Sequence, residues 1–357
     1  MAHDMCKRAV FLGARKCPQY IVDSSAIPQI EPGQVLAKIR LATICGSDVH
    51  TLQGKRIEET PSVLGHEGVA EIVQDERRNH GNLGPGDRIT FSVMDSCGEC
   101  ERCTQGLTQK CAKLFKYGHS SIHRRTGLNG CYASHIILHE GTRIVKLPDS
   151  VTDKMAAPVN CALATMVNAV GSIEHKRAPQ STVLIQGAGL LGIYACALLH
   201  DAGFGQIYCT DPKANRLKMV PLFGGIPIPS GKESEVLQDG AVDAVIEVCG
   251  VGAAINLGML LLKPGGTYIL AGLVHPDSCL NVTAEDIIRK CLTIKGIHNY
   301  SHQHLDEAVA FLARTANKYP YEQLVGPAFS LNQFESAVQE SIQGRFWRVA
   351  LDPTFTE

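Results

Sequence analysis

Four closely spaced cysteines form the most specific chemical pattern in the sequence. Cys97, Cys100, Cys103 and Cys111 follow the spacing C-x2-C-x2-C-x7-C. Four thiolates on one loop can close a tetrahedron around Zn²⁺, with bonds of about 2.3 Å. Because a shell of four sulfur atoms leaves no position for water or substrate, we expect this zinc to stabilise its loop rather than to catalyse. Unrelated structural cysteines would explain the spacing poorly.

A second set of metal-binding side chains is dispersed along the chain. Cys45 begins the motif Cys-Gly-Ser-Asp-x-His, His66 lies in Gly-His-Glu-Gly, and Cys161 follows Asn160. A catalytic zinc takes three protein ligands of this kind and keeps one position open. Taken singly, a histidine or cysteine is more often a buried structural residue. The three residues together favour a catalytic metal site.

A glycine motif, Gly-x-Gly-x-x-Gly at 187–192, follows a predicted strand at Thr182–Gln186 and opens an apolar helix. Glycine permits the tight turn and the close approach of the backbone to a diphosphate, which the N–H groups of the helix N-terminus bind. The residues that we assign to this dinucleotide site are Gly187, Gly189, Leu190, Leu191 and Gly192.

Asp211 ends the next predicted strand, where a carboxylate can accept hydrogen bonds from the adenosine ribose. It would repel a 2′-phosphate, so we expect NAD to be preferred over NADP. Arg216 follows five residues later and complicates this expectation. The alternative is that Asp211 only caps a helix that begins near Pro212.

The order of predicted elements indicates two kinds of domain. Residues 1–150 contain short strand-like runs and are β-rich, whereas from Thr182 strands alternate with helices, as in a doubly wound parallel sheet. The strands expected in the first part are Ala9–Gly13, Val35–Thr43, Val69–Val73, Arg88–Val93 and Tyr132–Leu138. The helices expected later are 191–202, 213–222, 253–262, 284–289, 305–316 and 333–342.

The composition limits the partners of the chain. Its 357 residues include 34 Lys and Arg against 35 Asp and Glu, so no strong field of either sign attracts nucleic acid or an anionic membrane. The N-terminus has no uninterrupted apolar segment, which predicts a cytoplasmic protein. In that compartment the 14 cysteines would be reduced thiols. The expected partners are small molecules and copies of the same chain, as a homodimer or homotetramer.

In these motifs, their order and their separations, the sequence resembles the zinc-containing medium-chain dehydrogenase/reductase family over its whole length. The resemblance implies an α/β protein with a GroES-like catalytic domain at 1–155, onto which 297–357 pack back, and a Rossmann NAD-binding domain at 156–296. It also implies a zinc-dependent alcohol dehydrogenase that transfers a hydride between an alcohol and NAD. A polyol dehydrogenase of the same family and a cofactor-binding protein without turnover remain as alternatives.

The resemblance further implies roles for individual residues. Cys45, His66 and Cys161 would hold the catalytic zinc, with Glu67 able to join the inner shell and Asp48 orienting His66. Ser47 and His50 match the proton relay, which runs by way of the nicotinamide ribose hydroxyl, and Thr165 matches a position beside the nicotinamide. Position 46 is glycine where many relatives carry a basic residue toward the cofactor diphosphate. Arg348 is the candidate to replace that contact.

Three segments, at 114–119, 156–161 and 183–189, resemble a subgroup associated with phosphonate catabolism. Two cations could serve an anionic substrate: Arg56, in a segment that borders the substrate cleft in relatives, and Lys116, in the first of these segments. Arg56 could make a bidentate contact to phosphonate or carboxylate. The alternative is that both cations are solvated surface residues.

Overall fold

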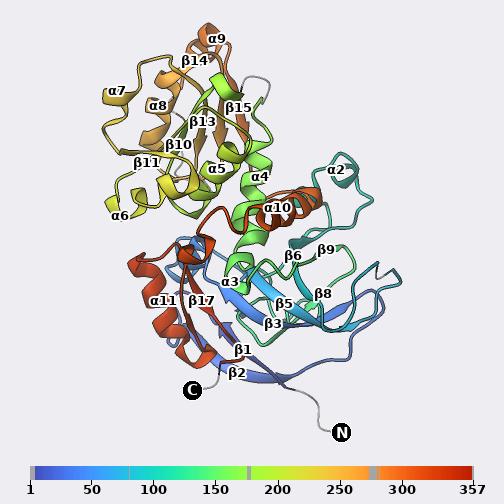
Figure 1. Ribbon diagram of the computed structural model, residues 1–357. Coiled ribbons are helices and arrows are strands. Elements are labelled where there is room, and N and C mark those ends of the chain that lie inside the picture. Colours follow the sequence, from blue (N-terminus) through green and yellow to red (C-terminus); the bar gives the residue numbers. More distant parts are fainter. Residues whose placement is uncertain (1–4, 80, 175–177, 273–279, 281, 356–357) are drawn as a thin grey trace. The chain divides into compact units, whose positions relative to one another are not determined.

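The computed structural model describes residues 5–79, 81–174, 178–272, 280 and 282–355, which fall into two compact units (Figure 1). One unit runs to Cys161 and resumes at Ser301, and the other comprises Ala162–Tyr300. The expected boundaries, after residues 155 and 296, lie a few residues before the observed ones. The difference matters for the chemistry, because it places Cys161 in the same unit as Cys45 and His66.

The described residues of the first unit form an eight-stranded sheet, in which β16-β17-β3-β5-β6-β7 are neighbours, β8 pairs with β3 and β9 pairs with β6. A smaller sheet has the order β2-β1-β4. Strand β17 pairs antiparallel with β3, so the end of the chain joins the N-terminal sheet. The strands are β1 Met5–Phe11, β2 Tyr20–Ala26, β3 Val35–Thr43, β4 Ser62–Val63, β5 Glu67–Asp75, β6 Arg88–Asp95, β7 Phe115–Lys116, β8 His135–Leu138, β9 Thr142–Lys146, β16 Val325–Phe329 and β17 Arg348–Leu351.

Helical segments complete this unit. Among them, α10 and α11 match the two amphipathic helices expected after residue 300 to within three residues at their ends. The segments are α1 Gly46–Leu52, α2 Glu101–Thr104, α3 Asp153–Ala156, α10 His302–Thr315 and α11 Phe334–Gln343, with the 3-10 turns η1 Thr108–Lys110, η5 Tyr321–Leu324 and η6 Leu331–Gln333 and the π-helical turn η2 Val159–Leu163.

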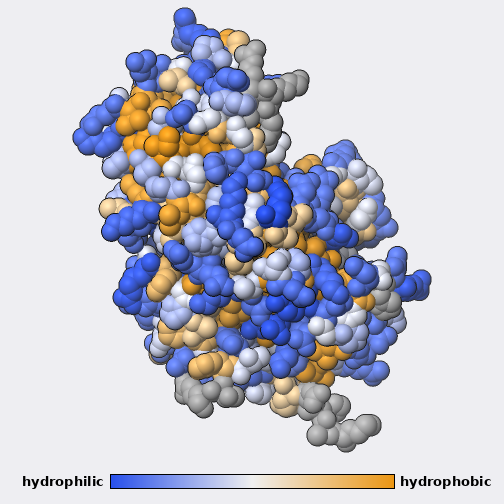
Figure 2. Space-filling model, in the orientation of Figure 1, coloured by the Kyte–Doolittle hydropathy of each residue, from blue (hydrophilic) through white to orange (hydrophobic). Residues whose placement is uncertain are grey.

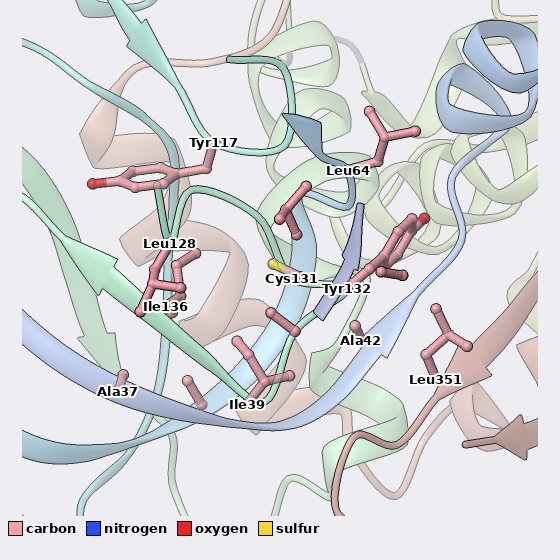
Figure 3. Close-up of a cluster of buried hydrophobic side chains, with 14 of the residues drawn as sticks. Ala37, Ile39, Ala42, Leu64, Tyr117, Leu128, Cys131, Tyr132, Ile136 and Leu351 are labelled. Carbon is pink, nitrogen blue, oxygen red and sulfur yellow. The ribbon is translucent and has the colours of Figure 1, made fainter. Parts of the chain in front are cut away.

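One aromatic side chain in the core of the first unit, that of Tyr132, also makes a polar contact close to the candidate metal ligands. Tyr132 is fully buried among aliphatic residues such as Ile39 and Ala42 (Figure 3). Its hydroxyl donates a hydrogen bond of 2.8 Å to Asp48. Gly65 packs on the same ring, since a Cβ there would lie 2.5 Å from it. Only glycine therefore lets the chain approach Tyr132 this closely just before His66.

In the described part of the second unit, six parallel strands form a sheet of order β12-β11-β10-β13-β14-β15. The chain moves outward from β10 to β12, returns to β13 and moves outward again, which is the doubly wound arrangement expected from the sequence. Its elements are α4 Ala164–Val170, η3 Ala178–Gln180, β10 Thr182–Gln186, α5 Leu190–Asp201, β11 Gln206–Asp211, α6 Ala214–Leu217, η4 Val220–Phe223, β12 Ile226–Pro229, α7 Glu233–Val236, β13 Val242–Glu247, α8 Gly252–Leu261, β14 Leu262–Leu270, α9 Ala284–Lys290 and β15 Thr293–Gly296.

The prediction of one continuous helix at 213–222 in this unit is wrong. The structure has α6 and then the separate 3-10 turn η4, with Pro221 in the first turn of η4. Proline lacks the N–H that an α-helix needs, and its ring clashes with the carbonyl one turn earlier. The helix therefore ends before Pro221.

No helix in the described part of the chain is both long and apolar enough to cross a membrane. Figure 2 shows one face of the surface, on which hydrophobic residues gather over the part of the second unit that carries α7 and α8. Val236 and Leu260, from these two helices, are each about half exposed.

Candidate metal and cofactor sites

The four-cysteine loop forms one cluster at the end of β6. Cys97 follows that strand, Cys100 and Cys103 belong to the N-terminal end of α2, and Cys111 ends η1. Their sulfur atoms all lie within 4.8 Å of one another. The Sγ of Cys111 is 3.5 Å from that of Cys97 and 4.0 Å from that of Cys100. A tetrahedron with zinc–sulfur bonds has edges of about 3.8 Å, so the spacing fits Zn²⁺.

Backbone N–H groups of the loop point at these sulfur atoms. The N–H groups of Cys97 and Lys113 each lie 3.3 Å from the Sγ of Cys111, and that of Ala112 lies 3.5 Å from the Sγ of Cys100. Hydrogen bonds from Ala112 and Cys103 lower the pKa of the Cys100 thiol to about 6. Since thiolate is the form that binds metal, these hydrogen bonds favour the metal-binding form of Cys100.

The dispersed residues meet in a second cluster, which includes Cys45, His66, Glu67 and Cys161, with their ligand atoms within 4.8 Å of one another. Cys45 caps the N-terminus of α1, and His66 and Glu67 lie at the start of β5. Cys161 lies in η2, a π-helical turn of the kind that occurs frequently at functional sites. Two sulfurs, one nitrogen and a carboxylate are a donor set that suits zinc.

Asp48 positions two members of this cluster and is itself buried. One carboxylate oxygen accepts hydrogen bonds from the N–H of Cys45, at 3.0 Å, and from the hydroxyl of Tyr132. The other lies 3.4 Å from the Nδ1 of His66, longer than an ordinary hydrogen bond. This contact turns Nδ1 toward Asp48 and leaves Nε2 as the nitrogen for a metal, and Asp48 raises the pKa of His66 against the effect of burial.

Glu67 is held by a bidentate ion pair with Arg348. The Nε and Nη2 of Arg348 lie 2.7 and 2.8 Å from the two carboxylate oxygens, and Thr43 donates a hydrogen bond of 2.6 Å to the first. Nη2 also lies 3.5 Å from the Sγ of Cys45. The pKa of the Cys45 thiol is well below its usual range because of a hydrogen bond from Cys161 and the charge of Arg348.

Arg348 was expected at the cofactor diphosphate, and the structure places its side chain at Glu67 and Cys45. Nη1 donates to the carbonyl of Trp347, so each of its three nitrogens has a partner. The diphosphate contact stays a prediction. Both relay candidates, Ser47 and His50, lie on α1 next to Cys45, with Ser47 half-buried and His50 exposed.

The glycine motif forms a tight turn between β10 and α5. Gly187 has φ +117°, and a Cβ on Gly192 would lie 1.8 Å from the carbonyl oxygen of Gly187. In contrast, a Cβ on Gly189 would meet open space, which is where a diphosphate would lie at the helix N-terminus. Leu190 and Leu191 begin α5. The turn therefore fits a dinucleotide.

Asp211, at the end of β11, contacts this turn. Its carboxylate accepts hydrogen bonds from the N–H of Ala188, at 2.9 Å, and of Lys213, at 2.8 Å. The bond from Lys213 lies just before α6, whose N-cap is Lys213 and has no side-chain capping bond, so Asp211 does not cap that helix, and the bond from Ala188 is a contact with the glycine turn. Arg216 lies 3.6 Å from the same carboxylate. Thr165, the residue expected beside the nicotinamide, is buried in α4 of this unit.

The two cations proposed for an anionic substrate line one pocket of about 500 Å³ in the first unit. Arg56 and Lys116 share it with Glu58, His119 and Arg124. The ring of His119 packs against that of His66, with 4.8 Å between the ring centroids. This approach depends on Gly118, where a Cβ would lie 2.4 Å from the carbonyl oxygen of Gly65. The pocket thus lies next to a candidate metal ligand.

Charges in the pocket are partly paired. Arg56 forms an ion pair of 2.6 Å with Glu58, and Arg124 one of 3.3 Å with Glu59. Burial, together with the charges of Arg56 and Lys110, lowers the pKa of Lys116 to about 8. The pocket therefore combines a partly buried ammonium with two guanidinium groups.

Sequence reasoning missed three contributors to these sites: Tyr132, the pairing of Arg348 with Glu67, and Glu58. Tyr132 and Arg348 reach their partners across 84 and 281 positions of the chain. No local pattern encodes such contacts. Glu58 was detectable only as a carboxylate two residues after Arg56.

Comparisons with known proteins agree with this architecture. A family model described as the alcohol dehydrogenase GroES-like domain matches residues 31–149, and one described as zinc-binding dehydrogenase matches residues 191–314. The L-threonine 3-dehydrogenase of Legionella pneumophila (strain Corby) is 27% identical, over 95% of this chain and 98% of its own length.

Solved structures show the same fold. An alcohol dehydrogenase from Thermotoga maritima superposes with a TM-score of 0.89 at 25% identity, covering 98% of this chain and 99% of the other. The alcohol dehydrogenase from Thermus sp. ATN1 gives a TM-score of 0.85 at 24% identity, covering 97% and 99%. The second likeness concerns the fold alone.

Proposed function

Because the chain belongs to the zinc-binding alcohol dehydrogenase family, we propose that it transfers a hydride between NAD and the carbinol carbon of an alcohol that carries an anionic group, such as a phosphonate. Each chain would hold two zinc ions, one at Cys97, Cys100, Cys103 and Cys111 and one at Cys45, His66 and Cys161. When bound, the second zinc supplies Lewis acidity to the carbinol oxygen and NAD supplies the hydride acceptor.

The side chains of this protein have distinct tasks in that reaction. Asp48 orients His66. Arg348 balances the charge that Glu67 adds beside the two thiols, so Glu67 can remain close without a large electrostatic cost. The hydroxyl of Ser47 accepts the proton of the alcohol while it releases its own proton toward the exposed imidazole of His50, and His50 releases a proton to solvent.

The observation that carries the substrate proposal is the cationic pocket beside His66. Arg56 and Lys116 lie there together, although 60 positions separate them in the sequence. A guanidinium and an ammonium next to a metal site suit an oxyanion on the substrate. The relatives named L-threonine 3-dehydrogenase favour a second candidate, a hydroxy amino acid, whose carboxylate could use the same cations. A polyol has no anionic group and would use neither of the two cations.

Arg56→Ala tests the substrate proposal. Charge-assisted hydrogen bonds contribute roughly 1.5–3 kcal/mol, so the catalytic efficiency with a hydroxyalkyl phosphonate should fall by about one to two powers of ten. The efficiency with a neutral alcohol of similar size should fall much less. Lys55→Ala, an exposed neighbour outside the pocket, is the matched control. An equal, small loss on both alcohols would dismiss the anion-binding role.

We also propose a preference for NAD over NADP. Asp211 and the buried Glu233, which accepts a hydrogen bond from Thr210 at 2.6 Å, place two carboxylates at the end of β11. Both would repel a 2′-phosphate, and the ion pair with Asp211 reduces the charge that Arg216 can offer it. Steady-state kinetics with each cofactor are the test. Comparable catalytic efficiency with both would show that Asp211 does not face the ribose.

The proposed assembly is a homodimer or homotetramer in the cytoplasm. Strand β15 is an edge of the described parallel sheet and is mostly exposed. An open strand edge of this kind can pair with a second copy of the chain. The hydrophobic residues exposed on α7 and α8 offer a further contact surface.

A further inference from the structure

Glu58 joins the cationic pocket to the candidate metal ligand through a single carboxylate oxygen. Oε1 lies 2.6 Å from the Nε of Arg56 and 3.0 Å from the Nδ1 of His119. The Glu58 side chain is only 10% exposed. His119 in turn packs against His66. One acidic side chain therefore contacts both the guanidinium expected to bind substrate and the ring next to the metal cluster.

These contacts fix how each partner presents its remaining nitrogens. Arg56 contacts Glu58 through Nε, and the edge of the guanidinium formed by Nη1 and Nη2 lies opposite that nitrogen, where it can make a bidentate contact. A carboxylate only accepts hydrogen bonds, so the neutral His119 ring must carry its proton on Nδ1. Nε2 is then an acceptor.

We propose that Glu58 is a positioning residue that gives the enzyme its selectivity for oxyanion-bearing alcohols, an inference that rests on the proposed function. Glu58 contacts no substrate. It holds the guanidinium of Arg56 with its two terminal nitrogens toward the oxyanion and holds the ring of His119 against His66. Without it, Arg56 samples other rotamers and His119 loses its fixed tautomer.

A positioning role and a purely electrostatic role of Glu58 predict opposite changes in the binding of an anionic substrate when Glu58 is replaced, so an experiment can separate them. If Glu58 acted only as a negative charge that competes with the substrate, removing that charge would strengthen binding of an anion. Glutamine separates the two effects, because its oxygen still accepts hydrogen bonds from Arg56 and His119 but carries no charge.

The experiment compares Glu58→Ala and Glu58→Gln with the wild type on a hydroxyalkyl phosphonate and on a neutral alcohol of the same length. In Glu58→Ala we expect the ratio of the two kcat/KM values to fall about tenfold, mainly through KM for the phosphonate. Glu58→Gln should retain the ratio within about threefold of wild type. Glu285→Ala, which removes an exposed carboxylate whose Oε1 lies 2.6 Å from the Nε of Arg289 outside the pocket, is the matched control and should leave the ratio unchanged.

A double variant locates the effect. If Glu58 acts through Arg56, Glu58→Ala combined with Arg56→Ala should lose no more selectivity than Arg56→Ala alone. Should Glu58→Ala not yield folded, zinc-loaded protein, Glu58→Asp, which withdraws the carboxylate by one methylene group, replaces it and should show a smaller fall in the ratio.

Four outcomes overturn the proposal. A rise of the ratio in both Glu58→Ala and Glu58→Gln would identify plain charge competition, and an equal loss on both alcohols would identify general structural damage. An unchanged ratio in Glu58→Ala, with a wild type that prefers the phosphonate, would reject the role of Glu58 and retain the proposed function. A wild type without that preference would reject the substrate proposal and the role of Glu58 with it.

Discussion

At the scale of single residues, the candidate catalytic cluster depends on side chains outside the sulfur and nitrogen donors. Asp48 contacts Cys45 and His66, and Arg348 contacts Glu67 and Cys45. The donors themselves were predictable, because Cys45 and His66 lie in short motifs. The pairing of Glu67 with Arg348 was not, since only the antiparallel register of β17 with β3 brings the end of the chain to the start of β5.

The lowered pKa of Lys116 leads to a prediction about how the KM of an anionic alcohol depends on pH. The pKa of Lys116 is lowered to about 8, so the ammonium is charged below that pH and loses its charge as the pH rises through 8. The KM for an alcohol that bears a carboxylate, whose own charge is constant in this range, should therefore rise above pH 8. The KM for a neutral alcohol provides the baseline.

The control for this pH effect is Lys116→Met. The variant should bind the carboxylate alcohol weakly at every pH and lose the additional rise near pH 8. A pH profile that is the same in Lys116→Met and in wild type would assign the change to another group.

At the scale of elements, short segments place the chemistry. The first turn of α1 supplies Cys45 and Asp48, and the π-helical turn η2 supplies Cys161. The strands and helices with strong periodicity were predictable, such as β3 and β10, whose bounds match the expectation. Strand β12, Ile226–Pro229, was not predicted, because two of its four residues are proline and it forms only as an edge strand beside β11.

Replacing one cysteine with serine should have different consequences in the two clusters. Cys100→Ser removes one of four ligands from the loop after β6, so thermal unfolding should shift several degrees lower with most activity retained per folded chain. Cys45→Ser should instead lower kcat by at least about two powers of ten with little change in unfolding. Calorimetry and steady-state kinetics on both variants are the measurements.

Cys17→Ser, at an exposed thiol outside both clusters, is the control and should change neither property. A loss of activity in Cys100→Ser as large as in Cys45→Ser, in fully folded protein, would show that the two clusters do not divide their roles in this way.

At the scale of the whole molecule, the two units carry different parts of the proposed reaction. The unit that contains the N- and C-terminal segments holds both metal-binding clusters and the cationic pocket, and the Ala162–Tyr300 unit holds the glycine turn and Asp211. The sequence predicts this division, because each motif lies on its own type of element. The substrate pocket was less predictable, since Arg56 and Lys116 meet only through tertiary structure.

Zinc at Cys45, His66 and Cys161 is proposed to support hydride transfer to NAD, and removing and restoring this metal tests that role. Reduction of NAD by an alcohol is followed through the absorbance of the reduced nicotinamide while zinc is removed with a chelator and then restored, and the zinc content of each sample is determined. We expect two zinc ions per chain in active enzyme and activity that disappears and returns with one of them. Full activity in protein with a single zinc at the four-cysteine loop, or activity that no chelator removes from zinc-free protein, would contradict it.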